Sequence, residues 1–222
     1  MPLLRLSRNR RQPAALCSNR ANSSFWSSVG SAVHPQRRAL EWARSVLALR
    51  GVVFLDTETT GVGRFDEVIE IAVLDVSGRV LLQSLVQPTR PVHPEAARVH
   101  GLTDAILAHA PSWPVVYREL LAVLRSFPLV ITYNADFDRR LIAQTCARQG
   151  LPPPQPDWHC AMRRFAEYAG PPPVDSWRRY HRLAEALERL GLSHPGHHRA
   201  AADAEACREL VHAMARGLPL RF

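Results

Sequence analysis

Short apolar runs alternate with amphipathic stretches along the chain from about residue 35 onward. Runs of this length, bounded by Gly, Pro, Asn or Asp, predict β-strands. Two of them flank Ser77-Gly78, which predicts a β-hairpin. The fully apolar start of another, Leu129-Val130-Ile131, predicts an internal strand. The predicted strands cover residues 52–58, 68–76, 79–86, 129–133 and 157–160, the last as an edge strand.

The stretches between these runs carry apolar residues at helical spacing, three or four positions apart. Asn134 and Thr103 are good helix N-caps, and Gly150 and Gly191 are typical stops. The predicted helices cover residues 35–50, 94–98, a short turn after Thr103, 112–126, 135–148, 162–168, 182–190 and 200–216. A hairpin followed by strand–helix alternation predicts an α/β fold, with a mixed five-stranded sheet and helices on both faces.

Within the predicted hairpin, Ile69, Ile71 and Val73 alternate with Glu70, Ala72 and Leu74. This alternation predicts a strand with one well-covered face. The Pro-rich segments at 152–156 and 171–173 are expected to be loops.

The net charge of +8 is concentrated near the N-terminus. The first 50 residues hold nine Arg and a single acid, Glu41, which leaves 19 of the 28 basic and 19 of the 20 acidic residues for the remainder. Residues 1–35 are rich in Arg, Ser and Asn and show no periodicity, so we expect a disordered basic tail before one domain at 36–222. An upstream start codon, an organelle transit peptide or a nucleic-acid-binding arm would each explain this tail.

The composition indicates a soluble protein of a reducing compartment. No apolar run approaches membrane-spanning length, so no membrane association is expected. Four cysteines (17, 146, 160 and 207) show no zinc-like spacing, which favours free thiols. We therefore expect a cytoplasmic, bacterial location, with organelle targeting by the tail as the alternative.

The run Phe54-Leu55-Asp56-Thr57-Glu58 ends by presenting two carboxylates. Side chains alternate along a strand, so Asp56 and Glu58 point to one face, and Val53 and Leu55 to the other. Two adjacent carboxylates repel each other and are costly to bury unless a cation lies between them. Hard cations such as Mg²⁺ or Mn²⁺ favour such oxygen ligands, although solvated acids at a strand end would also explain the pair.

Two more acids stand where they could join this pair. Asp138 follows the internal strand at the first turn of the next helix, where the helix dipole alone would favour Asp136 and Asp138. That end of a strand is also where sites collect in α/β sheets. Asp203 lies in the final helix, and His198 can reach over it only if His198 belongs to the incoming loop. The other histidines, 181, 194, 197 and 212, are expected at the surface or in structural hydrogen bonds.

Three segments together, Asp56-Thr-Glu58-Thr-Thr-Gly, Asn134-Ala-Asp-Phe137-Asp138 and His198-Arg-Ala-Ala-Ala-Asp203, resemble the three motifs of the DEDDh exonucleases. This family includes the epsilon proofreading subunit of bacterial DNA polymerase III, RNase T and oligoribonuclease. The resemblance spans roughly residues 50–215, and it includes Val99-His100-Gly101-Leu102-Thr103 and Arg182–Leu187. Tyr133 departs from the family pattern, which usually has His before Asn-Ala.

The resemblance implies an RNase H-like fold and a metal-dependent 3′–5′ exonuclease that releases nucleoside monophosphates from nucleic acid with a free 3′ end. It implies two divalent ions, Mg²⁺ or Mn²⁺, held by Asp56, Glu58, Asp138 and Asp203, with His198 as general base. It also implies that the 3′-terminal nucleotide is contacted by Thr57, Thr59, Val99, His100, Leu102 and Phe137.

We expect DNA to be preferred over RNA, with an exoribonuclease using the same residues as the nearest alternative. A noncatalytic, polymerase-associated module on the same fold is a further alternative. Only about 19 residues follow Asp203, which favours a stand-alone or loosely associated enzyme over a tightly docked polymerase subunit.

Overall fold

The computed structural model describes residues 34–170, 180–194, 196 and 198–221. Most of the predicted tail at 1–35 therefore lies outside the described residues, as do the predicted loop at 171–173 and His197. Pro35 itself is the first residue of helix α1, a position where a missing N–H is harmless because no helical partner exists for it.

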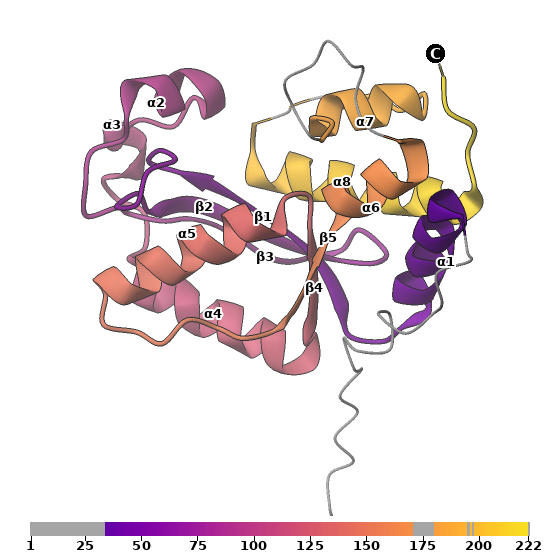
Figure 1. Cartoon of the computed structure of the whole chain (residues 1–222). Coiled ribbons are helices and arrows are strands. Elements are labelled where there is room, and N and C mark those ends of the chain that lie inside the picture. Colours follow the sequence, from indigo (N-terminus) through magenta and orange to yellow (C-terminus); the bar gives the residue numbers. More distant parts are fainter. Residues whose placement is uncertain (1–33, 171–179, 195, 197, 222) are drawn as a thin grey trace, which may run out of the picture. The chain divides into compact units, whose positions relative to one another are not determined.

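A mixed five-stranded sheet forms the centre of the domain, in the order β3-β2-β1-β4-β5 (Figure 1). Strand β1 pairs antiparallel with β2 and parallel with β4, and β5 is an edge strand, as predicted. Since β1 and β4 are parallel neighbours, their carboxyl ends meet at the same edge of the sheet. The strands are β1 (Val52–Thr59), β2 (Val68–Asp75), β3 (Val80–Leu85), β4 (Leu129–Thr132) and β5 (Asp157–Cys160).

Eight helices in the described part of the chain surround this sheet, most within two residues of their predicted bounds. The helix predicted at 94–98 continues to His100, where Gly101 ends it in the left-handed conformation that glycine adopts without strain. The helices are α1 (Pro35–Ala48), α2 (Pro94–His100), α3 (Asp104–Leu107), α4 (Trp113–Ser126), α5 (Ala135–Arg148), α6 (Ala161–Ala169), α7 (Leu183–Arg189) and α8 (Ala200–Arg216).

Two hydrophobic layers cover the two faces of the sheet. On one face, α4 and α5 pack over Val53 and Leu55 of β1. On the other, α1, α6, α7 and α8 pack over Val52 and Phe54 (Figure 1). The alternation predicted for β1 is therefore confirmed, and it assigns Asp56 to the α8 side of the sheet.

Strand β2 differs from the prediction of one covered face, because all eight of its residues are buried. Val68, Ile71 and Val73 contact the α4–α5 layer, while Ala72 and Leu74 pack against α8. The alternation of apolar and less apolar residues in β2 therefore does not correspond to one buried and one solvent-facing side of the strand.

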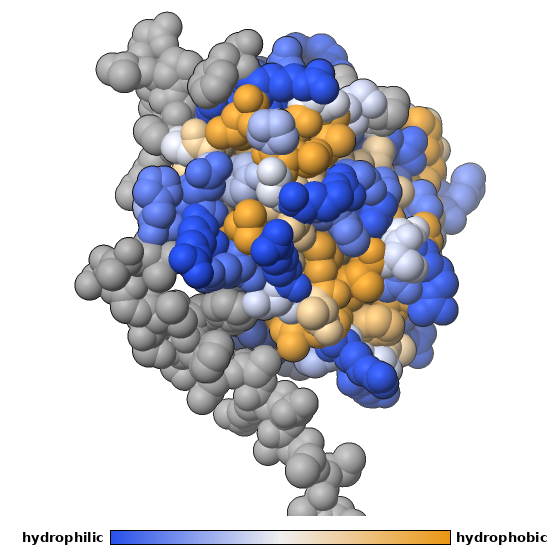
Figure 2. All heavy atoms as spheres, turned by 90° about the vertical axis from the view of Figure 1, so that its right-hand side faces the viewer, coloured by the Kyte–Doolittle hydropathy of each residue, from blue (hydrophilic) through white to orange (hydrophobic). Residues whose placement is uncertain are grey.

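Helix α1 closes the layer on the α8 side. Its Trp42 is 1% exposed and donates a hydrogen bond from Nε1 to Nδ1 of His159 on β5, at 3.0 Å. Figure 2 shows the side of the domain where α1 lies, with hydrophobic areas separated by hydrophilic ones. Leu40, Leu47, Leu218 and Leu220 are partly buried against this layer. No helix among the described residues has the length and apolar character needed to cross a membrane.

Candidate active site

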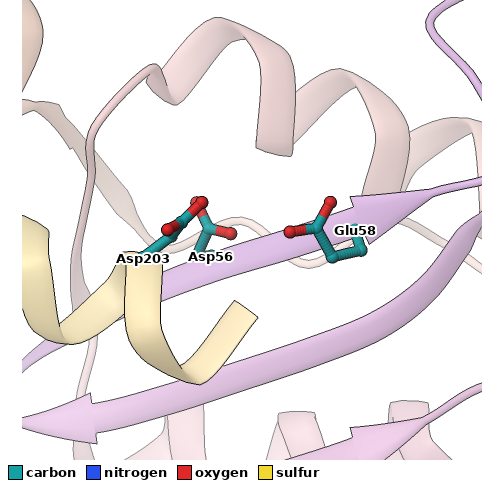
Figure 3. Close-up of side chains that lie close together, drawn as sticks. All are labelled: Asp56, Glu58 and Asp203. Atoms are coloured by element: carbon teal, nitrogen blue, oxygen red, sulfur yellow. The ribbon is translucent and has the colours of Figure 1, made fainter. Parts of the chain in front are cut away.

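Three carboxylates converge where β1 passes the start of α8. Asp56 and Glu58 extend from β1 on the α8 side, and Asp203 extends from the first turn of α8 (Figure 3). One carboxylate oxygen from each lies within 4.8 Å of the others. Three oxygen ligands at this spacing suit a hard divalent cation.

Asp138 of helix α5 lies beside this cluster, close enough for its charge to raise the pKa values of Asp56 and Glu58. It lies in the first turn of that helix, and its side chain is buried. Thr57, which alternates with Asp56 and Glu58, donates a 2.8 Å hydrogen bond from Oγ1 to Oδ1 of Asp138. The strand thus presents its acids to α8 and uses the threonine between them to orient the acid of α5.

Burial, and for Asp56 and Glu58 also mutual repulsion, raises the pKa values of these acids. Burial, followed by the charges of Asp203, Glu70 and Asp138, raises the pKa of Glu58 to about 8. Burial raises the pKa of Asp138 to about 7, although the Thr57 hydrogen bond opposes the shift. Burial and the charge of Asp138 raise the pKa of Asp56 well above its ordinary value. Raised pKa values of this kind are expected where several carboxyl groups are buried together without a balancing positive charge.

A fifth acid, Glu70 of β2, lies directly opposite Glu58 in the sheet and is 2% exposed. Arg199 contacts it twice, from Nε to Oε2 at 3.0 Å and from Nη2 to Oε1 at 2.7 Å. The backbone N–H of Ala200 donates to the same Oε2 at 3.1 Å. Glu70 thus anchors the N-terminal end of α8 to the sheet, next to the residues that precede Asp203.

His198 lies in the loop that leads into α8, as predicted, and its side chain is exposed. Its φ of 63° is unusual for a residue with a side chain, and such strained positions cluster at functional sites. Its backbone N–H donates to Oδ1 of Asp203 at 3.3 Å. This contact fixes where the His198 backbone stands relative to a candidate metal ligand.

His194 is a second histidine beside Asp203. Its Nε2 lies 2.8 Å from Oδ1 of Asp203, and its side chain is 8% exposed. No sequence pattern distinguishes His194 from the other structural histidines, because a loop conformation rather than a periodic pattern brings it here. Burial raises the pKa of Asp203, and the neighbouring His194 opposes this shift.

A pocket of about 550 Å³ adjoins the carboxylates on the α2 side. Five of the six residues predicted to contact a terminal nucleotide line it: Thr57, Thr59, Val99, His100 and Phe137. Leu102, the sixth, is 3% exposed and packs beneath α2 with Ile69, Val92 and Leu107. Glu58, Val62 and His93 also line the pocket, so one candidate metal ligand faces directly into it.

His100 holds two walls of this pocket together. Its Nδ1 accepts a 3.0 Å hydrogen bond from the backbone N–H of Leu102, which assigns the proton to Nε2. That Nε2 donates to the carbonyl of Thr59 at 3.2 Å. Burial also lowers the pKa of His100, which favours the neutral ring that this hydrogen-bond pattern requires.

Other residues singled out in the sequence have structural partners. Tyr133, the departure from the family pattern, donates its hydroxyl proton to the carbonyl of His181 at 2.7 Å. Asp136 forms an exposed ion pair with Arg163. His212 lies with Nε2 3.0 Å from the carbonyl of Val76.

Glu70 and Arg199 lie next to the acids of the site and were not among the residues predicted from the sequence. A signal for Glu70 was present, because it is the single acid in an apolar run from Val68 to Leu74. A charge in such a run is rarely buried without a partner. The position of Arg199 next to His198 could then have suggested the partner.

The sequence around this site matches a known protein family. The family model described as Exonuclease (RNase_T) matches residues 53–211, which include all four of Asp56, Glu58, Asp138 and Asp203. The chain belongs to this exonuclease family. It is therefore a nuclease of the hydrolase class, similar to the DNA polymerase III epsilon subunits.

Relatives of this exonuclease differ in how much of their length they share with it. An uncharacterized exonuclease, CP81, of Escherichia phage 186 is 37% identical over 175 residues, covering 74% of this chain and 88% of the relative. The DNA polymerase III epsilon subunit of Pasteurella multocida is 35% identical over 96 residues, covering 39% of this chain. The match spans only 38% of that epsilon subunit.

Solved structures confirm the RNase H-like fold of the exonuclease. The nuclease domain of 3′hExo, a DEDDh family member bound to rAMP, superposes with a TM-score of 0.63 at 17% identity. That match covers 78% of this chain and 96% of the other. Exonuclease X in complex with 5′ overhanging duplex DNA gives a TM-score of 0.51 at 26% identity, covering 74% and 92%.

Proposed function

We propose that this exonuclease hydrolyses DNA from its 3′ end with the help of two divalent metal ions and releases nucleoside monophosphates. The observation that carries the proposal is the convergence of Asp56, Glu58 and Asp203 beside buried Asp138, at the edge of a pocket. Four carboxylates from three separate segments have no structural reason to meet in one place.

The donor set fits Mg²⁺ or Mn²⁺. Every ligand offered is a carboxylate oxygen, the type that hard cations prefer, and the raised pKa values of Asp56, Glu58 and Asp138 reflect charges that a cation would balance. When bound, a pair of such ions supplies a lowered pKa for an attacking water and stabilisation of charge on the phosphate and leaving oxygens. Asp56, Glu58, Asp138 and Asp203 would hold the pair.

His198 is the proposed general base. An exposed imidazole can accept a proton from water near neutral pH. The hydrogen bond from its backbone to Asp203 keeps the His198 main chain beside a candidate metal ligand. His194 lies on the same carboxylate and is proposed to orient Asp203.

The pocket is the proposed site for the 3′-terminal nucleotide. Its volume of about 550 Å³ falls within the range of small-molecule sites. Phe137 and Val99 offer apolar surface to a base, and Glu58 lies at the pocket wall, next to the other carboxylates. A phosphodiester entering from this pocket would therefore reach the acids.

The preference for DNA is supported by two similar proteins whose name or solved complex refers to DNA. Exonuclease X, at 26% identity, was solved with DNA, and Exodeoxyribonuclease 10 of Escherichia coli is 31% identical over 112 residues. That sequence match covers 49% of this chain and 44% of the relative. The nuclease domain of 3′hExo, which was solved with rAMP, is 17% identical to this chain, and its likeness is one of fold.

Matched single-stranded DNA and RNA oligonucleotides test this proposal in one experiment. We expect Mg²⁺-dependent, stepwise shortening of a 5′-labelled DNA strand, no shortening in EDTA, and slower loss of RNA. A DNA strand blocked by a 3′-phosphate is the control for end specificity. Faster hydrolysis of RNA than of DNA would replace the proposal with an exoribonuclease, and an absence of hydrolysis despite Mg²⁺ binding would favour a noncatalytic module.

A further inference from the structure

Four exposed side chains form a compact group at the mouth of the pocket: Arg64, Phe65, Arg90 and Arg140. The guanidinium carbon of Arg64 lies 4.2 Å from the centre of the Phe65 ring, and that of Arg90 lies 5.6 Å from the same ring. We call this group the arginine–phenylalanine surface. Arg64 and Phe65 stand between Gly63 and Asp66, which both line the pocket, so this surface adjoins the pocket rim.

Arg140 joins the surface to the pocket itself. Its guanidinium carbon lies 5.4 Å from the centre of the Phe137 ring, and Phe137 is part of the pocket wall. Its Nη1 also lies 3.4 Å from the carbonyl oxygen of Val62. The cationic surface is thus continuous with the pocket.

The arginines of this surface do not form ion pairs with acidic residues in the described part of the chain. Within the described ranges, no carboxylate lies within ion-pair distance of Arg64, Arg90 or Arg140. Arg148, further along α5, shows the contrast because it pairs with buried Glu67 at 3.3 Å. Residues 51–222 carry equal numbers of Arg and acidic residues, so three arginines without an ion-pair partner concentrate positive charge on this part of the rim.

The loop that presents the surface is held in place from α5. Gln144 donates from Nε2 to the carbonyls of Gly63 and Asp66 at 3.1 and 3.2 Å. Arg148 donates to the carbonyl of Phe65 at 3.2 Å. Asp66 accepts from Thr60 within the same loop. A surface fixed in this way loses little conformational freedom when it binds a partner.

An exposed aromatic ring flanked by guanidinium groups has the chemistry that recognises single-stranded nucleic acid. Guanidinium groups pair with phosphates, and both the ring and the guanidinium planes stack on bases without sequence preference. A strand whose last nucleotide occupies the pocket must leave across the rim. The arginine–phenylalanine surface lies on that rim.

We infer that the arginine–phenylalanine surface binds the part of the nucleic-acid strand that lies upstream of the terminal nucleotide. The inference rests on the proposed function, since it requires a 3′ end in the pocket. Arg64 and Arg90 contact phosphates, and Phe65 stacks on a base. The surface therefore favours long strands over dinucleotides and adds to affinity rather than to the chemical step.

Strands of different length test this inference. We compare the double variant Arg64→Gln/Arg90→Gln with wild type on a dinucleotide and on a 12-nucleotide DNA strand. Arg118→Gln/Arg125→Gln, which removes two exposed arginines of α4, is the matched control. We expect kcat/KM on the 12-mer to fall about tenfold because KM rises. The value of kcat/KM on the dinucleotide should not change. The slope of log affinity against log salt concentration should become shallower by about 0.7 for each phosphate that no longer pairs with an arginine.

Equal loss on both substrates, or a loss no larger than that of the control, overturns the inference. Fluorescence anisotropy of a labelled 12-mer, measured in EDTA, separates this failure from failure of the proposed function. If wild type degrades neither substrate, the exonuclease proposal fails. If the Arg64→Gln/Arg90→Gln variant binds the 12-mer more weakly and the control variant does not, the inference about the surface is still supported. Unchanged binding by the Arg64→Gln/Arg90→Gln variant would reject it.

Discussion

Glu70 and Arg199 stand 129 positions apart in the chain and form a two-contact ion pair at 3.0 and 2.7 Å. Glu70 is 2% exposed and Arg199 is 49% exposed, so the pair links the buried sheet to the surface. Because the N–H of Ala200 also donates to Glu70, the pair determines where α8 begins. The placement of Asp203 against Asp56 and Glu58 therefore depends on a carboxylate that is not itself in the three-acid cluster.

We expect Arg199→Gln to weaken both the fold and the site, because it leaves a buried charge next to Glu58. Loss of one partner of a buried pair costs about 3–5 kcal/mol, and the exposure of Arg199 reduces this to about 1–2 kcal/mol. Chemical denaturation measures the stability, and titration with Mn²⁺ measures the site.

The double variant Glu70→Gln/Arg199→Gln should recover part of the loss, since an amide pair removes the unbalanced charge. Arg208→Gln is a useful comparison, because Arg208 also pairs with acids on α8 but lies further along the helix than Asp203. If Arg199→Gln changed stability without changing Mn²⁺ affinity, Arg199 would be a structural residue only.

The metal-free protein should lose stability as the pH rises. Glu58 has its pKa raised to about 8 and Asp138 to about 7 in the folded state. The stability that a raised carboxyl pKa contributes is complete below the unfolded value and is lost as the pH passes the folded value. Tm measured in EDTA should therefore fall between about pH 5 and pH 8.

Addition of Mg²⁺ should reverse this fall, and more strongly at pH 8 than at pH 5, since the ligands must be ionised to bind. Glu58→Gln should flatten the pH dependence in EDTA, whereas Asp136→Asn, at an exposed acid paired with Arg163, should leave it unchanged. A Tm in EDTA that rises with pH across this range would show that the acids are already balanced by another charge.

Asp56→Asn should abolish most activity while making the metal-free protein more stable. The substitution removes a proposed metal ligand, and we expect hydrolysis to fall by at least about 10²–10³-fold, the scale set by one charge-stabilising group. It also removes one of several mutually repelling carboxylates, so Tm in EDTA should rise.

Hydrolysis assays and thermal unfolding on the same sample provide both readouts. Asp136→Asn serves as the matched control, since it also changes an aspartate to asparagine but lies outside the cluster. Wild-type activity in Asp56→Asn would mean that the metal assignment is wrong.

Three histidines that precede Asp203 in the sequence should differ in their effect on turnover. His198→Ala should lower kcat by roughly 10²–10⁴-fold, as expected for loss of a general base. His194→Ala should have a smaller effect, mainly on metal affinity, because His194 contacts Asp203. His197→Ala should do little.

The pH profile of kcat separates a base from a positioning residue. Loss of the acidic limb of the profile in His198→Ala, with the limb retained in His194→Ala, identifies His198 as the base. The opposite pattern would transfer that role to His194.

The positions of the clustered acids could be predicted from the sequence because these residues lie at the ends of regular elements. Asp56 and Glu58 follow from the two-residue period of β1, and Asp138 from the boundary between β4 and α5. Helix α8 was predicted with its observed bounds, and in the structure Gly217 ends it in a left-handed conformation. Patterns of this kind are local and survive without tertiary information.

Other features depend on contacts between distant segments. Glu70 looked like an outward-facing residue of a half-covered strand, and only the packing of α8 on β2 makes it buried. Arg64, Arg90 and Arg140 are scattered along the chain, and no local pattern relates them. His194 reaches Asp203 through a loop whose course has no periodicity.

Helix α1 has a practical consequence for anyone who wishes to shorten this enzyme. The matched family region starts at residue 53, so a protein trimmed to that region would keep every acid of the cluster. It would also strip Ala39, Trp42, Ala43 and Val46, all at most 1% exposed, from the layer over β1 and leave His159 without its indole donor. The domain that folds stably is thus larger than the region matched by the family model. Precipitation of a trimmed protein would therefore reflect the loss of helix α1 and not a defect in the acids of the cluster.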